Sequence, residues 1–346
     1  MSDSNRRETV LVTGGSGFIA THCLLALHRA GYALRATLRS LDRKTELDAV
    51  LRKAAGADVR VDWFAADLLR DAGWREAVTG AAAVLHVASP LPRVLPKDPA
   101  ALIEPARDGA LRLLRAASRA GVRRVVMTSS TAAICYGRGQ IDRPYTEADW
   151  SDPEGADNSS YTRSKTYAEL AAWEFMRKEG GALELVTVNP GAVLGPVLEK
   201  DYGTSPEIVL KLMTGAFPGI PDFDFPIVDV RDVADLHVSA LRTPEAAGQR
   251  FLCVSGNMNM REIADVLRAH LPERASKLPR RRLPHWMVRA ASLFDPVTRA
   301  VVFELGIRRE CDTSQARRVL GFAPRPVAEA VRATADSLIA QGLVGS

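Results

Sequence analysis

Short apolar runs alternate with longer segments of helical spacing along the first half of the chain. The runs are rich in aliphatic residues and predict strands at 9–13, 33–38, 59–64, 83–87, 125–128 and 183–189. Between them, apolar residues recur three and four positions apart, which predicts helices at 18–30, 43–55, 71–79, 99–120 and 159–179. Gly31 and Gly121 follow two of these helices as natural stops. This alternation predicts βαβ units and a parallel sheet.

Beyond Pro190 the pattern is less regular, because glycine and proline are frequent from 191 to 226. A turn and helix follow at 229–242, then a strand at 250–254 and a mainly helical tail from 260. We therefore expect an α/β protein with a doubly wound parallel sheet and a smaller, discontinuous C-terminal lobe. The expected division is 1–190 plus 227–255 for the sheet domain, and 191–226 plus 256–346 for the lobe.

Composition agrees with a globular protein that has a large core. The chain has 346 residues, 47% of them hydrophobic and 25% charged, with 46 Lys and Arg against 41 Asp and Glu. These values exclude collagen-like and wholly disordered chains. The four cysteines are far apart and form no C-x-x-C pair, which argues against a disulfide framework and against a metal site. Neither a signal peptide nor a membrane-spanning run is evident, so we expect a cytoplasmic protein without membrane contact.

Positive charge gathers in the tail, most densely in Lys277–Arg282, which reads K-L-P-R-R-R. Such a patch occurs in nucleic-acid sites. Because no nucleic-acid motif and no interleaved aromatic residues accompany it, we interpret it as a solvated basic loop and expect no nucleic-acid partner.

The first predicted strand leads into a loop that carries phosphate-binding features. Gly15-x-Gly17-x-x-Ala20 fits the spacing G-x-G-x-x-G/A between a strand and a helix. Small residues permit the tight turn and the close approach of a pyrophosphate, and the helix N-terminus offers unpaired N–H groups. The loop residues that we expect at a dinucleotide are Gly14, Ser16, Gly17, Phe18 and Ile19. A parallel sheet with this loop predicts a Rossmann-type fold.

The second strand indicates which dinucleotide binds. NAD-binding proteins place Asp or Glu about 20 residues after the loop, where it accepts hydrogen bonds from the ribose 2′-hydroxyl. Here Arg39 follows the predicted strand, and the first acid is Asp42, followed by Arg43 and Lys44. A guanidinium suits a 2′-phosphate. We therefore predict NADP(H), with Arg39 and Lys44 near its 2′-phosphate.

Tyr161 and Lys165 lie near the start of a predicted helix, one turn apart on one face. A neighbouring ammonium lowers the pKa of a phenol, which makes the pair a plausible proton donor to a carbonyl oxygen. The pattern Y-x-x-x-K is common by chance. Its supporting context is Ser130, which follows the preceding strand.

Together these motifs resemble the extended short-chain dehydrogenase/reductases, and among them the branch of dihydroflavonol reductases, cinnamoyl-CoA reductases and yeast aldehyde reductase. The likeness covers 1–255 well and the tail loosely, and Ala20 stands where the family usually has a third glycine. The stretches that carry it are Arg35-Ala-Thr-Leu-Arg39, His86-Val-Ala-Ser-Pro90, Thr128-Ser-Ser130, Glu147-Ala-Asp-Trp150, Tyr161-x-x-Ser-Lys165-Thr-x-Ala-Glu169, Asn189-Pro190-Gly191 and Val228-Asp-Val-Arg-Asp-Val-Ala234.

The resemblance implies roles for individual residues. Tyr161 is expected to be the general acid in reduction, Lys165 to lower its pKa and bind the nicotinamide ribose, and Ser130 to polarise the carbonyl, with Ser129 and Thr131 as alternatives. The remaining expected cofactor contacts are Asp67, Leu68, Val87, Ala88, Ser89, Pro190, Gly191, Val193 and Ser205. The implied function is NADPH-dependent reduction of an apolar or aromatic aldehyde or ketone. The implied assembly is a monomer or a homodimer.

Two other functions fit the same fold less well. Sugar-nucleotide dehydratases place Asp-Glu after the active-site hydroxyl residue, where this chain has Ala132-Ala133, and epimerases typically retain NAD. A non-catalytic NADPH sensor would lose the Tyr161/Lys165 pair, which is present here. Among the other residues, His86, His22, His28 and His237 are interpreted as structural or exposed. Several aromatic residues, including Trp286, Phe294 and Phe303, are interpreted as ordinary core rather than as a pocket lining.

Overall fold

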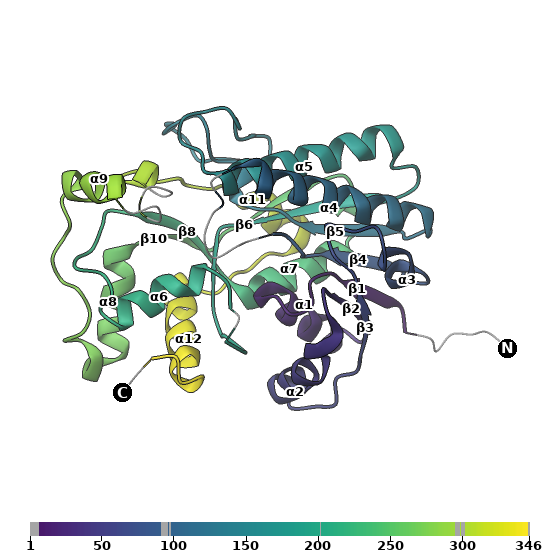
Figure 1. Ribbon diagram of the computed structural model, residues 1–346, viewed down its shortest axis with the longest axis horizontal. Coiled ribbons are helices and arrows are strands. Elements are labelled where there is room, and N and C mark those ends of the chain that lie inside the picture. Colours follow the sequence, from purple (N-terminus) through teal and green to yellow (C-terminus); the bar gives the residue numbers. More distant parts are fainter. Residues whose placement is uncertain are drawn as a thin grey trace.

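The structure, a computed structural model, describes residues 7–90, 96, 98–200, 202–294, 298 and 302–344. Seven parallel strands form its main sheet, in the order β3-β2-β1-β4-β5-β6-β9 (Figure 1). They are β1 (Thr9–Val12), β2 (Ala33–Leu38), β3 (Val61–Ala65), β4 (Ala83–His86), β5 (Arg124–Thr128), β6 (Glu184–Pro190) and β9 (Arg250–Cys253). This order confirms the predicted doubly wound sheet, in which the chain changes direction between β1 and β4.

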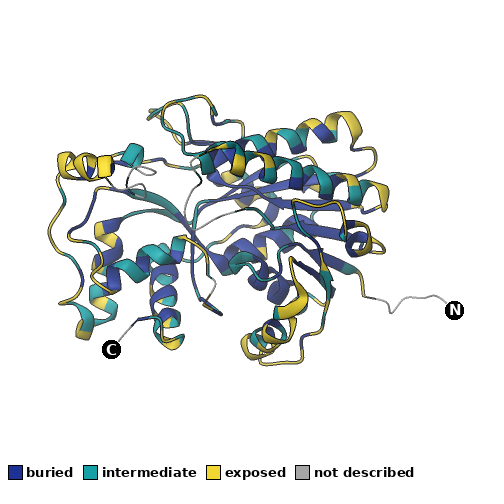
Figure 2. Cartoon of the chain, viewed as in Figure 1, coloured by how far each residue is buried: buried dark blue, intermediate teal, exposed yellow. Residues whose placement is uncertain are grey.

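Helices cover both faces of the main sheet, so its strands are buried (Figure 2). Alternate residues of one strand serve the two sides: Val10 and Val12 pack into one apolar cluster and Leu11 into the other. The first cluster lies under α1 (Phe18–Arg29), α2 (Lys44–Ala55) and α7 (Val230–Arg242). The second lies under α3 (Trp74–Val78), α4 (Ala100–Arg119) and α5 (Ser160–Glu179).

A second sheet, of three strands, stands beside the first in the order β10-β8-β7. Its strands are β7 (Ala192–Leu194), β8 (Asp224–Asp229) and β10 (Gly256–Asn259), and none of the three was predicted. The helices α6 (Ser205–Met213), α8 (Met260–His270) and α12 (Val327–Ala340) share its apolar cluster. The remaining elements are α9 (His285–Phe294), α11 (Ser314–Leu320), η1 (Leu41–Arg43), η2 (Thr131–Ala133), η3 (Pro244–Ala246), η4 (Pro272–Arg274) and η5 (Val302–Glu304).

Two features of the tail and of β8 bear on the expected division of the chain. The boundary expected at residue 227 falls inside β8, which pairs within the smaller sheet. In addition, α11 lies in the tail but buries Ala316 and Leu320 in the cluster of the main sheet. The chain therefore passes more than once between the two sheets. The expected division into a sheet domain and a lobe stays a prediction.

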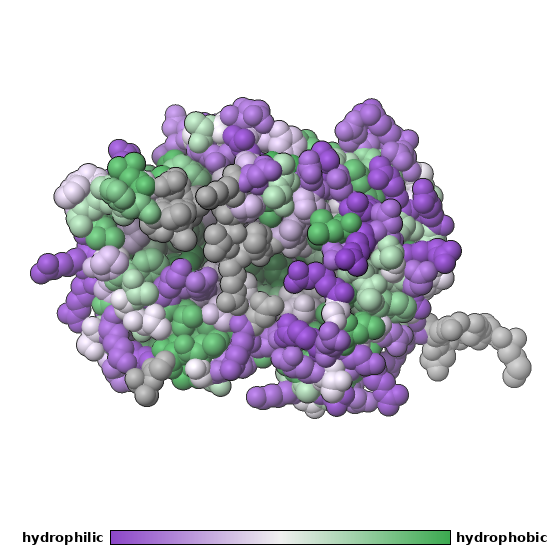
Figure 3. All heavy atoms as spheres, viewed as in Figure 1, coloured by the Kyte–Doolittle hydropathy of each residue, from purple (hydrophilic) through white to green (hydrophobic). Residues whose placement is uncertain are grey.

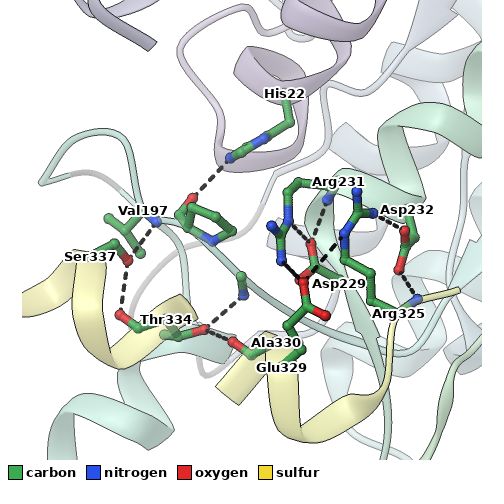
Figure 4. A network of polar contacts seen from close by, with 12 residues as sticks. His22, Val197, Asp229, Arg231, Asp232, Arg325, Glu329, Ala330, Thr334 and Ser337 are labelled. Atoms are coloured by element: carbon green, nitrogen blue, oxygen red, sulfur yellow. Dashed lines mark hydrogen bonds and ion pairs between the residues drawn. The ribbon is translucent and has the colours of Figure 1, made fainter. Parts of the chain in front are cut away.

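Side-chain contacts tie α12 to the rest of the molecule (Figure 4). Thr334 Oγ1 accepts a hydrogen bond from Gly195 N at 2.7 Å, and Ser337 Oγ accepts one from Val197 N at 2.8 Å. His22 of α1 contacts the Pro196 carbonyl oxygen at 2.9 Å from the opposite side. The segment between β7 and α6 is thus held both by the first helix and by the last.

A local constraint explains the short third helix. The predicted helix at 71–79 begins only at Trp74, because Gly73 has a φ of +87° and a Cβ there would lie 1.9 Å from the Ala65 carbonyl oxygen. Across the described residues, no helix is long and apolar enough to cross a bilayer, and no group of three His, Cys, Asp or Glu side chains is arranged to hold a metal ion.

Candidate active site

The loop between β1 and α1 is shaped by close backbone approaches. Gly14 has a φ of +67°, and a Cβ there would come within 3.1 Å of Ala88. Its N–H donates to Thr37 Oγ1 at 3.0 Å, while Gly17 N donates back to the Gly14 carbonyl at 2.8 Å. Gly17 caps α1 without a side chain, and the first turn of this helix carries no acid. The N-terminus of α1 is therefore compatible with an anionic group.

Thr13 joins this loop to the end of β4. Its hydroxyl accepts hydrogen bonds from Val87 N at 3.1 Å and Ala88 N at 3.0 Å, and it contacts His86 Nδ1 at 2.9 Å. Burial lowers the pKa of His86 to about 3, with the nearby charge of Lys165 acting in the same direction. His86 is therefore a neutral, packed residue, as its apolar strand predicts.

Two exposed cations at and after the end of β2, Arg39 and Lys44, have no acidic partner among the described residues. Arg39 is exposed at the carboxyl end of this strand, where a Rossmann-type sheet receives the ribose. Arg43, by contrast, forms ion pairs with Glu46 at 3.2 Å and with Glu199. Lys44 begins α2 and is also exposed. Of these two expected ligands of a 2′-phosphate, Arg39 directly follows β2, whereas Lys44 begins the next helix.

Ser130 and Tyr161 lie together at the carboxyl end of β5. Ser130 caps the short helix η2, so that its Oγ accepts from Ala132 N at 3.1 Å, and it donates a long hydrogen bond of 3.4 Å to the Pro190 carbonyl. Burial raises the pKa of Tyr161, while a hydrogen bond with Ser130 acts in the opposite direction. The Ser130 and Tyr161 side chains therefore lie near each other, although 31 positions separate them in the sequence.

Lys165 lies one helical turn after Tyr161 in α5, whose start is fixed by a capping box between Ser159 and Thr162. The Lys165 side chain is buried, with 7% of its surface exposed. Burial lowers its pKa to about 8, and the charge of Glu169 opposes this shift. With this pKa, Lys165 is mostly protonated at neutral pH but can release its proton slightly above it.

Glu169, one further turn along α5, is fully buried below the site. Its carboxylate accepts five hydrogen bonds, from Ser129 Oγ at 2.5 Å, Asn189 Nδ2 at 2.7 Å, Arg250 Nε at 2.7 Å, Thr187 Oγ1 at 3.0 Å and Trp173 Nε1 at 3.2 Å. Glu169 and Asn189 stand within the motifs that carry the family resemblance, but no role was predicted for either residue. The spacing of four residues from Lys165 was the available signal for Glu169.

The partners of Glu169 connect it to Ser130 and to β9. Asn189 Nδ2 also donates to the Ser130 carbonyl at 3.1 Å. Arg250 stacks its guanidinium 3.6 Å from the ring centroid of Trp150 and donates to the carbonyls of Glu147 and Asp149. The network therefore holds the Ser130 carbonyl and the side chain of the preceding Ser129.

The other expected cofactor contacts follow strands of the main sheet, with two exceptions, Val193 and Ser205. Asp67 and Leu68 follow β3, Val87, Ala88 and Ser89 follow β4, and all five are partly exposed. Pro190 ends β6, and a Cβ at Gly191 would come within 2.2 Å of the Pro226 carbonyl oxygen, so a side chain is excluded there. Val193 is buried in β7. Ser205 begins α6, under the smaller sheet.

The aromatic residues of the tail have mixed positions. Phe303 packs edge-on against Tyr136, with ring centroids 6.3 Å apart. Trp286 and Phe294 of α9 are 68% and 88% exposed, so their interpretation as ordinary core is wrong. Figure 3 shows apolar side chains on the surface over α9.

Comparison with known proteins identifies the family. The model of the NAD dependent epimerase/dehydratase family matches residues 10–253, which hold the glycine loop, Ser130, Tyr161 and Lys165. The chain belongs to this family. This confirms the resemblance to the extended short-chain dehydrogenase/reductases.

Proteins similar to this chain include reductases. Cinnamoyl-CoA reductase 1 of Petunia hybrida is 37% identical over 271 residues, covering 77% of this chain and 78% of the relative. Ketoreductase azaE of Aspergillus niger is 32% identical over 354 residues, covering 96% and 98%. The crystal structure of yeast methylglyoxal/isovaleraldehyde reductase Gre2 complexed with NADPH has a TM-score of 0.79 and 28% identity, and the match covers 96% of this chain and 99% of that one. NADPH is also the cofactor that Arg39 predicts here.

Proposed function

We propose that this protein is an NADPH-dependent carbonyl reductase that reduces an apolar or aromatic aldehyde or ketone to the alcohol. The observation that carries the proposal is the arrangement of Ser130, buried at the carboxyl end of β5, near Tyr161 and Lys165 in the first turns of α5. Reductases among the relatives, including one solved with NADPH, support it.

The residues of this chain fit NADPH. Gly14 leaves room where a Cβ would meet Ala88, and the start of α1 offers N–H groups without a competing acid. Arg39 is exposed and would hold the 2′-phosphate, whereas NAD would need an acid at this place. When bound, NADPH would supply the hydride for the carbonyl carbon.

The chain's own groups would handle the charge on the carbonyl oxygen. Tyr161 would donate its proton to that oxygen, since burial keeps the phenol protonated. Ser130 would turn its hydroxyl from the 3.4 Å contact with Pro190 to hydrogen-bond the same oxygen. Lys165 would favour release of the phenol proton through its positive charge.

We place the carbonyl substrate between the main sheet and the segments 191–226 and 256–346, because ligands of open α/β sheets bind beyond the carboxyl ends of the strands. Replacing these segments by those of a related reductase should change substrate preference while NADPH affinity persists. A preference that followed the sheet domain instead would contradict the placement.

The test of the function is a panel of aldehydes and ketones, scored by the loss of NADPH absorbance. Turnover of apolar or aromatic carbonyl compounds, with NADPH preferred to NADH, is the expected result. An epimerase or dehydratase would instead convert a sugar nucleotide without net consumption of NADPH, so the same assay with sugar nucleotides separates the two functions. If NADPH bound but no carbonyl compound were reduced, the proposal would fail.

A further inference from the structure

Cys135 and Cys311 come together although 176 positions separate them in the sequence, with their sulfur atoms 3.9 Å apart. Both are free thiols. Cys135 follows η2, five residues after Ser130, and Cys311 lies in the segment that leads from η5 to α11. They belong to one small apolar cluster with Ile134 and Tyr145.

Hydrogen bonds hold the two segments against each other on both sides of the sulfur pair. Tyr145 N donates to the Glu310 carbonyl at 2.8 Å, and Asp312 N donates to the Tyr145 carbonyl at 2.8 Å. Arg309 Nε donates to the Cys135 carbonyl at 2.8 Å. The backbone beside each cysteine is thus held by hydrogen bonds, and the two sulfur atoms must approach from 3.9 Å to the roughly 2.05 Å of a disulfide bond.

The buried side chain of Arg309 adds further contacts between the same two segments. Its guanidinium is paired with Asp157 at 3.0 Å and with Glu304, and it lies 4.1 Å from the ring centroid of Tyr136. Only 4% of Arg309 is exposed. The segment 302–312 is therefore packed directly on the loop that follows Ser130.

We propose that Cys135 and Cys311 form a redox-active dithiol, which a low-molecular-weight disulfide such as glutathione disulfide converts to an intramolecular disulfide. The bond would fasten the C-terminal segment to the loop after Ser130. This inference does not depend on the proposed carbonyl reductase function.

The exposure of the two thiols sets the order of the steps. Cys311 is partly exposed, whereas Cys135 has 0% exposure and burial raises its pKa. The Cys311 thiolate would attack glutathione disulfide and release one glutathione thiolate. Cys135 would then attack the Cys311 sulfur, lose its proton to solvent and release the second glutathione. One glutathione disulfide is reduced to two glutathione molecules for each protein disulfide formed.

The chain holds its own control in the other two cysteines. Cys23 and Cys253 are fully buried, and burial raises the pKa of both thiols. They should stay reduced under conditions that oxidise the pair.

The experiment equilibrates the full-length protein with glutathione disulfide and then counts free thiols after denaturation, with intact mass and peptide mapping. Wild type should lose two of its four thiols, lose the mass of two hydrogen atoms and yield one linked peptide pair, Cys135 with Cys311. Cys135→Ser should stop at a glutathione adduct on Cys311. Cys311→Ser should keep all its thiols.

The oxidised protein should also unfold at a Tm higher by roughly a few degrees, because the bond closes a long loop of the unfolded chain. Neither serine variant should show a redox-dependent Tm. Four free thiols after oxidation, a glutathione adduct that persists on wild type, or a link through Cys23 or Cys253 would each overturn the proposal. A lowered Tm of the bridged form would show that the pair is not preorganised and would overturn it as well.

Discussion

Asn189 shares its side-chain amide between Glu169 and Ser130: Nδ2 lies 2.7 Å from the Glu169 carboxylate and 3.1 Å from the Ser130 carbonyl oxygen. A buried carboxylate two helical turns after Tyr161 is thereby connected to the backbone of Ser130. Because Glu169 also raises the pKa of Lys165, it acts on the site through position and through charge.

Glu169→Gln should shift the alkaline limb of the kcat/KM profile for carbonyl reduction to lower pH. The alkaline limb is expected to follow the pKa of Lys165, which is about 8. The Glu169 charge raises this pKa, so removing that charge should lower it. The measurement is the pH dependence of NADPH consumption. Trp173→Phe is the matched control, since it deletes one hydrogen bond to Glu169 and keeps the charge. Equal shifts of the alkaline limb in both variants would show that the charge of Glu169 does not set the pKa of Lys165.

Tyr161→Phe should lower kcat by at least about 10²-fold, because the general acid is lost while the ring volume is retained. Ser130→Ala should lower kcat by about 10²-fold or more if its hydroxyl stabilises the developing charge. NADPH affinity, measured by fluorescence titration, should change little in both. The double variant should be far from additive. Near wild-type turnover by Tyr161→Phe, with chemistry limiting, would refute the catalytic assignment.

Arg39→Ala should weaken NADPH binding by about 1.5–3 kcal/mol, or roughly 10–100-fold, and leave NADH binding unchanged. The reason is the loss of a charge-assisted contact to the 2′-phosphate. Arg43→Ala is the matched control, because its guanidinium is paired with Glu46 and Glu199. Both affinities can be measured by calorimetry. Equal affinity of the wild type for NADPH and NADH would contradict the assignment of Arg39 to the 2′-phosphate.

Lys165→Met should abolish most of the turnover and yet raise Tm near neutral pH. The folded-state pKa of Lys165, about 8, lies below its usual value of 10.5, so the buried ammonium destabilises the fold by up to about 3 kcal/mol below pH 8. This destabilisation is relieved as pH rises from 8 to 10.5. The Tm difference between variant and wild type should therefore shrink over that window, which a thermal series in buffered solutions would measure.

Acid should destabilise the protein through its buried histidines. Burial lowers the pKa of His22 to about 4, of His86 to about 3 and of His237 to about 4, all from 6.5. The unfolded chain therefore binds protons first. The free energy of unfolding has its full value above pH 6.5 and falls as pH drops toward 4. At about pH 5 each of these histidines has lowered it by about 2 kcal/mol.

His237 offers the test of this acid effect. Its Nδ1 lies 2.8 Å from the Val233 carbonyl and must carry the proton, so its Nε2 accepts from Thr128 Oγ1 at 2.7 Å. His237→Gln should cost stability near pH 7 but lose less of it on acidification, as measured by urea unfolding at each pH. An unchanged acid slope would exclude His237 as a contributor.

Much of the main sheet could be predicted because its signals are local. The alternation of strand and helix, the glycine loop and the stops at Gly31 and Gly121 all lie within one or two elements, and the family match confirms the fold. The smaller sheet lacked such signals: β7 has only three residues, and Gly256 finds its partner Ile227 far back in the sequence. Glu169 and Arg250 are 81 residues apart, so their buried pair was beyond local pattern analysis.

The repeated passage of the chain between the two sheets limits how the molecule moves. It passes from β6 to β7 at Gly191, from β8 to α7 at Asp229, and from β9 to β10 before Gly256. In addition, His22 of α1 and Thr334 of α12 form hydrogen-bond contacts with the segment at 195–197. With so many connections, no single hinge separates the sheets. We therefore expect that proteolysis releases neither part intact and that the chain melts as one cooperative unit.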